Sequence, residues 1–189
     1  MIWTPNAKVI VVGGGVRSGK SSFALARAEA LGARRVFVAT GQALDAEMDE
    51  RIARHRAERG DRFTTLEAPI ELPAALAALG DGVEVALVDC LTLWLSNLLV
   101  RDEPVARVLE RVDELAEVLA RRRFHAIVVT NEVGMGVVPP SPLGRAFRDV
   151  AGTAHQRLAA VADELHLAVL GTVLRLRPPP ITGSDHAAR

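Results

Sequence analysis

The sequence is short of several features, and each shortage excludes a class of protein. A single cysteine, Cys90, excludes a disulfide framework and a four-cysteine zinc site. The 23 Lys and Arg residues balance 23 Asp and Glu residues, so the charge gives no sign of a broad nucleic-acid surface. No apolar run approaches the ~20 residues of a membrane-spanning helix. We therefore expect no nucleic-acid partner and no transmembrane segment.

The composition is that of an ordinary globular protein. Hydrophobic residues make up 49% of the 189 residues and charged residues 24%. The first six residues lack the basic and apolar regions of a signal peptide, which predicts a cytoplasmic protein. We expect one domain over residues 1–177 and a disordered tail, rich in Pro and Gly, over residues 178–189.

Apolar, β-branched runs alternate with stretches of helical periodicity along the chain. Such alternation is typical of an α/β fold with a mostly parallel sheet and helices on both faces. The strands are expected at 9–12, 36–39, 83–88, 126–129 and 167–170. The helices are expected at 20–31, 45–59, 73–79, 105–119 and 143–165.

A phosphate-binding motif follows the first expected strand and opens the first expected helix. It matches the pattern G-x-x-x-x-G-K-[ST] at every position and reads Gly14-Gly15-Val16-Arg17-Ser18-Gly19-Lys20-Ser21. Glycines allow consecutive backbone N–H groups to point at one phosphate, and the helix N-terminus adds partial positive charge. The motif in this context predicts a P-loop NTPase domain of the RecA-like type that binds a purine nucleoside triphosphate.

The scarcity of lysine supports this interpretation. Only Lys8 and Lys20 are lysines, so 21 of the 23 basic residues are Arg. An ammonium is a compact charge suited to the β- and γ-phosphates, whereas the Arg guanidinium is a planar fork. Ser21 is expected to offer its hydroxyl to Mg²⁺, and Asp89, at the end of the third expected strand, to hold Mg²⁺ or its waters.

A histidine stands on one face of the helix expected over 45–59. Met48, Ile52, His55 and Arg59 follow one another at spacings of four, three and four residues, which places them on that face. The neighbouring arginines favour a neutral imidazole, which can act as a nucleophile or a base. By spacing alone, a purely structural histidine in a charged helix is the favoured interpretation.

Several further segments carry a resemblance to a known family. The matching runs include 39–42, 45–48, 51–56, 65–69 and 88–99. The most distinctive run is 129–139, which contains Asn131-Glu132-Val133-Gly134-Met135-Gly136. Together with the phosphate loop they resemble the bifunctional adenosylcobinamide kinase and adenosylcobinamide-phosphate guanylyltransferase of cobalamin biosynthesis. The resemblance extends from residue 9 to residue 176.

The resemblance implies two reactions and a set of site residues. ATP or GTP phosphorylates a hydroxyl of adenosylcobinamide, and GMP passes from GTP through a guanylyl-histidine to adenosylcobinamide phosphate. His55 matches the guanylylated histidine, and Lys20 serves both reactions. The other implied nucleotide contacts are the loop from Gly14 to Ser21, Thr40, Gly41, Gln42, Arg56, Ala57, Glu58, Arg59, Glu67 and Asp89. A homotrimer and a corrinoid substrate are also implied.

The chain departs from the family pattern at a few positions. Phe63 stands where the family usually has Trp, His155 where Asn is usual, and Gly13 where Thr is common. The alternative function is a small-metabolite kinase with a P-loop and no nucleotidyl transfer, which would leave His55 unused. A nucleotide-dependent switch is a weaker alternative, because Asn131-Glu132-Val133-Gly134 is not the Asn-Lys-x-Asp guanine motif.

Overall fold

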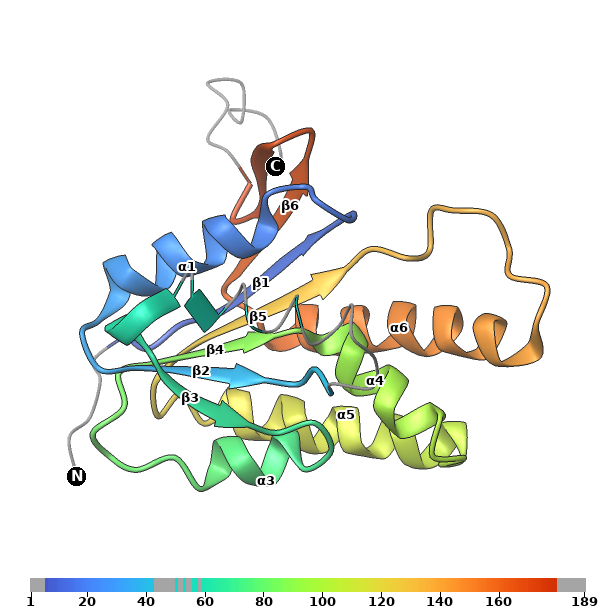
Figure 1. The fold of residues 1–189 in the computed structure, drawn as a ribbon, viewed down its shortest axis with the longest axis horizontal. Coiled ribbons are helices and arrows are strands. Elements are labelled where there is room, and N and C mark those ends of the chain that lie inside the picture. The colour runs from blue at the N-terminus through green and yellow to red at the C-terminus, as the bar shows by residue number, and fades with distance from the viewer. Residues whose placement is uncertain (1–5, 43–49, 51–52, 54–55, 58, 180–189) are drawn as a thin grey trace, which may run out of the picture.

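The computed structural model describes residues 6–42, 50, 53, 56–57 and 59–179 (Figure 1). Most of the helix expected over 45–59 therefore lies outside the described residues, including His55 and Glu58. Residues 180–189 of the expected tail lie outside them as well.

One seven-stranded sheet forms the centre of the fold, with the strand order β3-β2-β4-β5-β1-β6-β7. The pairing is parallel throughout except between β6 and β7, which are antiparallel. The fold is thus the mostly parallel α/β sheet that the alternating pattern predicts. The strands are β1 Val9–Gly14, β2 Arg35–Ala39, β3 Thr64–Glu67, β4 Val85–Asp89, β5 His125–Asn131, β6 Glu164–Val169 and β7 Thr172–Arg177.

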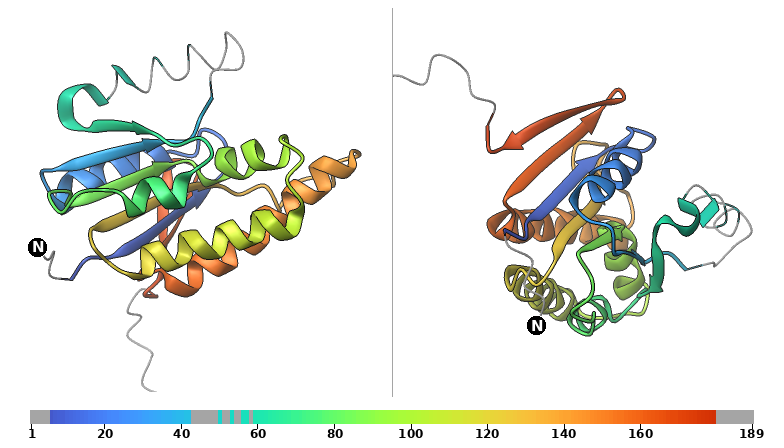
Figure 2. Two further views of the ribbon diagram at one scale, coloured as in Figure 1. Left: turned by 90° about the horizontal axis from the view of Figure 1, so that it is seen from below. Right: turned by 90° about the vertical axis from the view of Figure 1, so that its left-hand side faces the viewer.

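Helices cover both faces of the sheet because its central strands β1 and β5 are buried at nearly every position and are mostly apolar (Figure 2). In β1, Ile10 and Val12 face α1 (Lys20–Leu31), while Val9 and Val11 face the other helices. Successive strand residues point to opposite faces, so one strand supplies two cores. The helices of the second face are α3 (Leu72–Ala77), α4 (Leu91–Leu99), α5 (Val105–Ala120) and α6 (Pro142–Val161).

The predicted bounds are confirmed for α1 and nearly so for α5, but the end of α6 was predicted wrongly. The periodicity suggests a helix to residue 165, whereas α6 ends at Val161 and β6 begins at Glu164. Asp163 causes the difference, because its backbone N–H donates to Val9 O and its carboxylate accepts from Val9 N, both at 2.8 Å. Pairing with β1 therefore overrides the local helical pattern.

Two strands, one helix and one 3-10 turn were not predicted. The strand β3 is a short edge strand with mostly exposed side chains, and α4 is buried on nearly all sides, so neither shows a clear amphipathic period. The strand β7 returns beside β6 through a turn at Leu170 and Gly171, whose φ angles are 52° and 75°. Two positive φ angles are typical of a tight hairpin turn. A 3-10 turn, η1 (Gly60–Arg62), precedes β3.

A buried carboxylate joins three elements at the amino end of the sheet. Glu164, whose side chain is 10% exposed, accepts from Lys8 Nζ at 2.7 Å, Arg27 Nη2 at 2.9 Å and His166 Nε2 at 3.2 Å. Burial alone would raise the pKa of Glu164, but the hydrogen bonds from Lys8 and His166 and the positive charges lower it to about 2. The cluster fastens α1 to the beginnings of β1 and β6.

We expect Glu164→Gln to lower the free energy of unfolding by about 2 kcal/mol at pH 7, because Lys8 and Arg27 lose their partner. The folded pKa lies below the ordinary value of 4.5, so the carboxylate stabilises the fold above pH 4.5. This contribution fades as the pH falls towards about 2. Urea unfolding of both proteins at several pH values measures the difference.

Glu114→Gln is the matched control, because Glu114 is an exposed partner of Arg107 on α5. It should change the free energy of unfolding by less than about 0.5 kcal/mol. A difference between wild type and Glu164→Gln that stays constant down to pH 2.5 would contradict the assignment.

Candidate active site

The parallel strands end at one edge of the sheet, and the residues that follow them form the candidate site. The phosphate loop follows β1, Thr40 follows β2, Ala68 follows β3 and Cys90 follows β4. Ligands of open α/β sheets bind at this edge, where the loops leave the carboxyl ends of the strands. The topology therefore gathers most of the predicted site residues from distant parts of the sequence.

The phosphate loop has a conformation that depends on glycine at two positions. A Cβ on Gly14 would lie 2.5 Å from Ala168 O and 2.7 Å from Ser18 Oγ, so only glycine allows this close approach. Gly19, at the N-cap of α1, has φ 94°, which disfavours any other residue. Lys20 is buried, and its Nζ donates to Gly15 O at 3.0 Å, so the ammonium bends back over the loop. Ser21 is partly exposed in the first turn of α1.

Asp89 ends β4, and the chain next to it is locked by buried hydrogen bonds. The Thr40 hydroxyl donates to Cys90 O and accepts from Cys90 N, both at 2.8 Å. Asn97 of α4 donates to Thr40 O at 2.8 Å and to Pro69 O at 3.0 Å. These bonds hold the ends of β2, β3 and β4 together. The resemblance predicts that Thr40 contacts nucleotide, but its hydroxyl makes both of these hydrogen bonds within the protein.

A second group of polar side chains continues this network to β5. Asn131 Nδ2 donates to Thr92 Oγ1 at 2.9 Å, and the Cys90 thiol lies 3.3 Å from the same hydroxyl. Burial, and then the charge of Asp89, raises the pKa of the Cys90 thiol. The thiol therefore stays protonated at neutral pH and is a packing group rather than a nucleophile.

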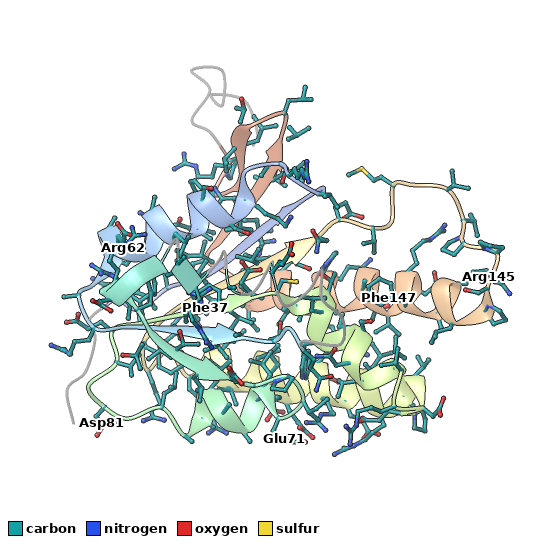
Figure 3. The ribbon with its side chains drawn as sticks, in the orientation of Figure 1. Phe37, Arg62, Glu71, Asp81, Arg145 and Phe147 are labelled. Carbon is teal, nitrogen blue, oxygen red and sulfur yellow. The ribbon has the colours of Figure 1, made fainter. Side chains whose placement is uncertain are left out.

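The described residues after His55 are anchored to the sheet and to α1. Arg56 Nη2 forms an ion pair with Glu67 Oε1 at 3.2 Å at the end of β3. Arg59 is buried, and its guanidinium carbon lies 3.5 Å from the ring centroid of Phe37 on β2. Arg62 forms an ion pair with Glu29 of α1; Phe37 and Arg62 are both labelled in Figure 3. The segment that carries His55 thus returns to the sheet at a fixed place.

The remaining residues that were predicted to contact nucleotide in this region differ in how far they are exposed. Ala57 is exposed, Gly41 and Gln42 are partly exposed, and Glu58 lies outside the described residues. Phe63, which stands where the family usually has Trp, is buried and packs edge-on against Phe37. Its ring belongs to the core beside α1, which leaves no face for a nucleotide base.

Sequence reasoning missed two polar residues at this edge. Glu132 follows β5, and its backbone N–H donates to Gly14 O at 3.1 Å, so it touches the phosphate loop. His155 of α6 bonds Thr130 Oγ1 at 2.8 Å, and its Nδ1 lies 3.7 Å from a carboxylate oxygen of Glu132. The signal was a run of polar residues directly after a buried strand, as at Asp89.

Fold and loop together define a P-loop NTPase with a RecA-like core. The solved structures that it resembles include a type III secretion system ATPase of pathogenic bacteria, with TM-score 0.54 and 13% identity. That likeness covers 85% of this chain and 50% of the ATPase. The RadB recombinase gives TM-score 0.50 and 16% identity over 85% of this chain and 73% of the recombinase. At such identities the likeness shows the fold alone.

The chain belongs to the cobinamide kinase / cobinamide phosphate guanyltransferase family, whose family model matches residues 10–176. The bifunctional adenosylcobalamin biosynthesis protein CobP of Pseudomonas aeruginosa is 42% identical over 168 residues, covering 89% of this chain and 96% of that protein. CobU of Escherichia coli, which has the same description, is 38% identical over 184 residues, covering 89% and 99%. The chain is thus a transferase with both activities of its family.

None of the helices in the described part of the chain combines the length and the apolar character needed to span a membrane.

Lys20→Ala should reduce both transfer reactions by at least about 10²-fold, because each needs the ammonium on the same phosphates. Lys20→Arg should also lose most activity, since the planar fork does not fit the buried ammonium position. Rates of phosphoryl and guanylyl transfer measure both effects.

Lys8→Arg is the control, because it replaces the other lysine and keeps a positive charge beside Glu164 at the opposite edge of the sheet. Full activity of Lys20→Ala in either reaction would point to a second nucleotide site.

Proposed function

We propose that this chain phosphorylates a hydroxyl of adenosylcobinamide with ATP or GTP, and then transfers GMP from GTP to adenosylcobinamide phosphate through a guanylyl group on His55. The observation that carries the proposal is the phosphate loop at the carboxyl edge of the sheet, with buried Lys20 folded over it. One loop that grips a triphosphate can serve both transfers, since each breaks a different P–O bond of the same chain of phosphates.

The loop supplies the contacts that a triphosphate needs. We assign nucleotide contacts to Gly14, Gly15, Val16, Arg17, Ser18, Gly19, Lys20 and Ser21. The N-terminus of α1 directs its first backbone N–H groups and a partial positive charge at this position. Ser18 Oγ is buried without a hydrogen-bond partner among the described residues, and a phosphate oxygen would satisfy it.

Ser21 and Asp89 are the residues that would hold Mg²⁺. A hydroxyl and a carboxylate are hard oxygen donors, which suits this ion, and both stand at the edge where the phosphates would lie. When bound, the ion neutralises charge that builds up on the phosphate oxygens.

The guanylyl step uses His55 as the nucleophile. A ring nitrogen forms a bond to the α-phosphorus, the bond to the bridging oxygen breaks, and pyrophosphate leaves. A phosphate oxygen of the acceptor then displaces the imidazole and takes the GMP. We also assign nucleotide contacts to the neighbouring residues Gly41, Gln42, Arg56, Ala57, Glu58, Arg59 and Glu67. The Arg56–Glu67 pair and the packing of Arg59 support this assignment, because they bring the segment after His55 to the sheet edge.

A homotrimer in the cytoplasm, acting on a corrinoid substrate, completes the proposal. Large apolar side chains stand exposed in two segments, the β5–α6 loop and the β6–β7 hairpin, which favours contact with other copies of the chain. The most exposed are Val137 at 95%, Leu170 at 96% and Met135 at 79%.

The alternative, a small-metabolite kinase without nucleotidyl transfer, would use the same loop and Asp89, but the family to which the chain belongs also has guanyltransferase activity. Such a kinase leaves no role for a histidine beside the nucleotide, so labelling of the protein by GTP discriminates between the two.

His55→Ala should abolish the covalent adduct and GMP transfer while nucleotide binding persists, because the phosphate loop is untouched. Intact-protein mass after incubation with GTP and Mg²⁺ should increase by one guanylyl group in wild type and not in the variant. His186→Ala, in the expected tail, is the histidine control. A normal rate of GMP transfer by His55→Ala would refute the covalent route.

Light scattering after size exclusion should give three times the chain mass of 20.2 kDa. Val137→Asp and Leu170→Asp should each shift the protein towards smaller species, because a charge would be buried in the interface. Val100→Asp, at an exposed valine between α4 and α5, is the control. A wild-type monomer at micromolar concentration would contradict the trimer.

A further inference from the structure

The kinase half of the proposed function needs a group that accepts a proton. The acceptor of the first reaction is a hydroxyl, which attacks phosphorus more readily when a base takes its proton. The acceptor of the second reaction is a phosphate, which is already an anion at neutral pH and needs no base. Neither Lys20 nor Ser21 can take this proton while bound to phosphate or Mg²⁺.

The described residues offer three carboxylates that directly end or follow strands at the site edge. Glu67 is exposed and paired with Arg56 at the end of β3. Asp89 is the residue that would hold Mg²⁺. The third is Glu132, which follows β5, the strand that lies between β4 and β1.

Glu132 is the carboxylate in direct backbone contact with the phosphate loop. Asn131 pairs in register with Gly14, and the next N–H, that of Glu132, donates to Gly14 O at 3.1 Å. The side chain therefore starts beside the loop, from the neighbouring strand. At 27% exposed it also remains open to an incoming substrate.

One hydrogen bond holds the Glu132 carboxylate, and an imidazole ring lies beside it. Oε1 accepts from Gly134 N at 2.6 Å, and a Cβ at Gly134 would lie 2.9 Å from the same oxygen. Only glycine at 134 permits this approach without moving the carboxylate. On the other side, His155 Nδ1 lies 3.7 Å from Oε2, while its Nε2 is fixed by Thr130.

The side chain beside the Glu132 carboxylate carries no positive charge. Burial lowers the pKa of His155, more than the nearby Glu132 raises it, so the imidazole is neutral at pH 7. Within the described part of the chain, the neighbour of the Glu132 carboxylate is this neutral histidine rather than Arg or Lys. A guanidinium would hold the lone pairs that a base must offer, and a neutral ring does not.

We infer that Glu132 is the general base of the kinase reaction. As the acceptor oxygen forms its bond to the γ-phosphorus, its proton passes to Oε2 of Glu132. The bond between the γ-phosphorus and the bridging oxygen breaks, and the nucleoside diphosphate leaves with that electron pair. Glu132 then releases the proton to water. The inference rests on the kinase half of the proposed function.

The test compares Glu132→Gln with wild type in the two reactions separately. Glutamine keeps the shape and the acceptor for Gly134 N–H but cannot take a proton. The kcat for phosphorylation of adenosylcobinamide should fall by about 10²- to 10⁴-fold. The GTP-dependent guanylyl adduct, and GMP transfer to adenosylcobinamide phosphate supplied directly, should stay within about twofold.

A loss in the kinase rate alone distinguishes a general base from a residue that only supports the structure. Equal losses in both would mean that Glu132 merely supports the loop, and an unchanged kinase kcat would mean that another group takes the proton; either result overturns the inference. Glu114→Gln, on the surface of α5, should leave both rates unchanged. Wild-type protein that transfers GMP but never phosphorylates adenosylcobinamide would overturn the kinase half of the proposed function, and this inference with it.

Discussion

The parallel pairing of β1 with β5 is the constraint on which the site depends. It runs in unbroken register from Val9 with Ala126 to Gly14 with Asn131, and the Glu132 N–H extends it by one bond. Both strands are buried on both faces, so a slip by one residue would exchange the side chains of the two cores. The register therefore fixes which polar residues stand beside the phosphate loop.

Behind the loop, a buried polar network makes the sheet edge rigid. Thr40 and Cys90 exchange two hydrogen bonds, and Asn97 and Asn131 extend the network to α4 and β5. Each group is satisfied by another, so removal of one would leave its partner buried and unpaired, which is costly. The site thus combines a fixed floor with exposed residues at the loop tip, such as Val16 and Arg17.

The sequence predicted what local pattern and motif chemistry determine. The loop, α1 and the parallel sheet follow from apolar runs, glycines and Lys20, and the structure confirms them. The boundary of α6 with β6 was missed because the bonds between Asp163 and Val9 join residues far apart in sequence. Thr40 was predicted to contact nucleotide, but its partner Cys90 is fifty residues away and invisible to spacing. The role of His55 lies outside the described residues and stays a prediction.

One phosphate loop can serve two acceptors because the reacting phosphorus atoms lie at opposite ends of the triphosphate. Attack at the γ-phosphorus expels a diphosphate, and attack at the α-phosphorus expels pyrophosphate, so the two nucleophiles approach from different directions. In the fold, the groups proposed for the two reactions come from different elements. Glu132 reaches the loop from β5, the adjoining strand. The segment after His55 is anchored by Arg59 on β2 and by Arg62 on α1. A base is needed only in the first direction, since the attacking hydroxyl must lose a proton, whereas a neutral imidazole nitrogen and a phosphate anion attack through atoms that carry none.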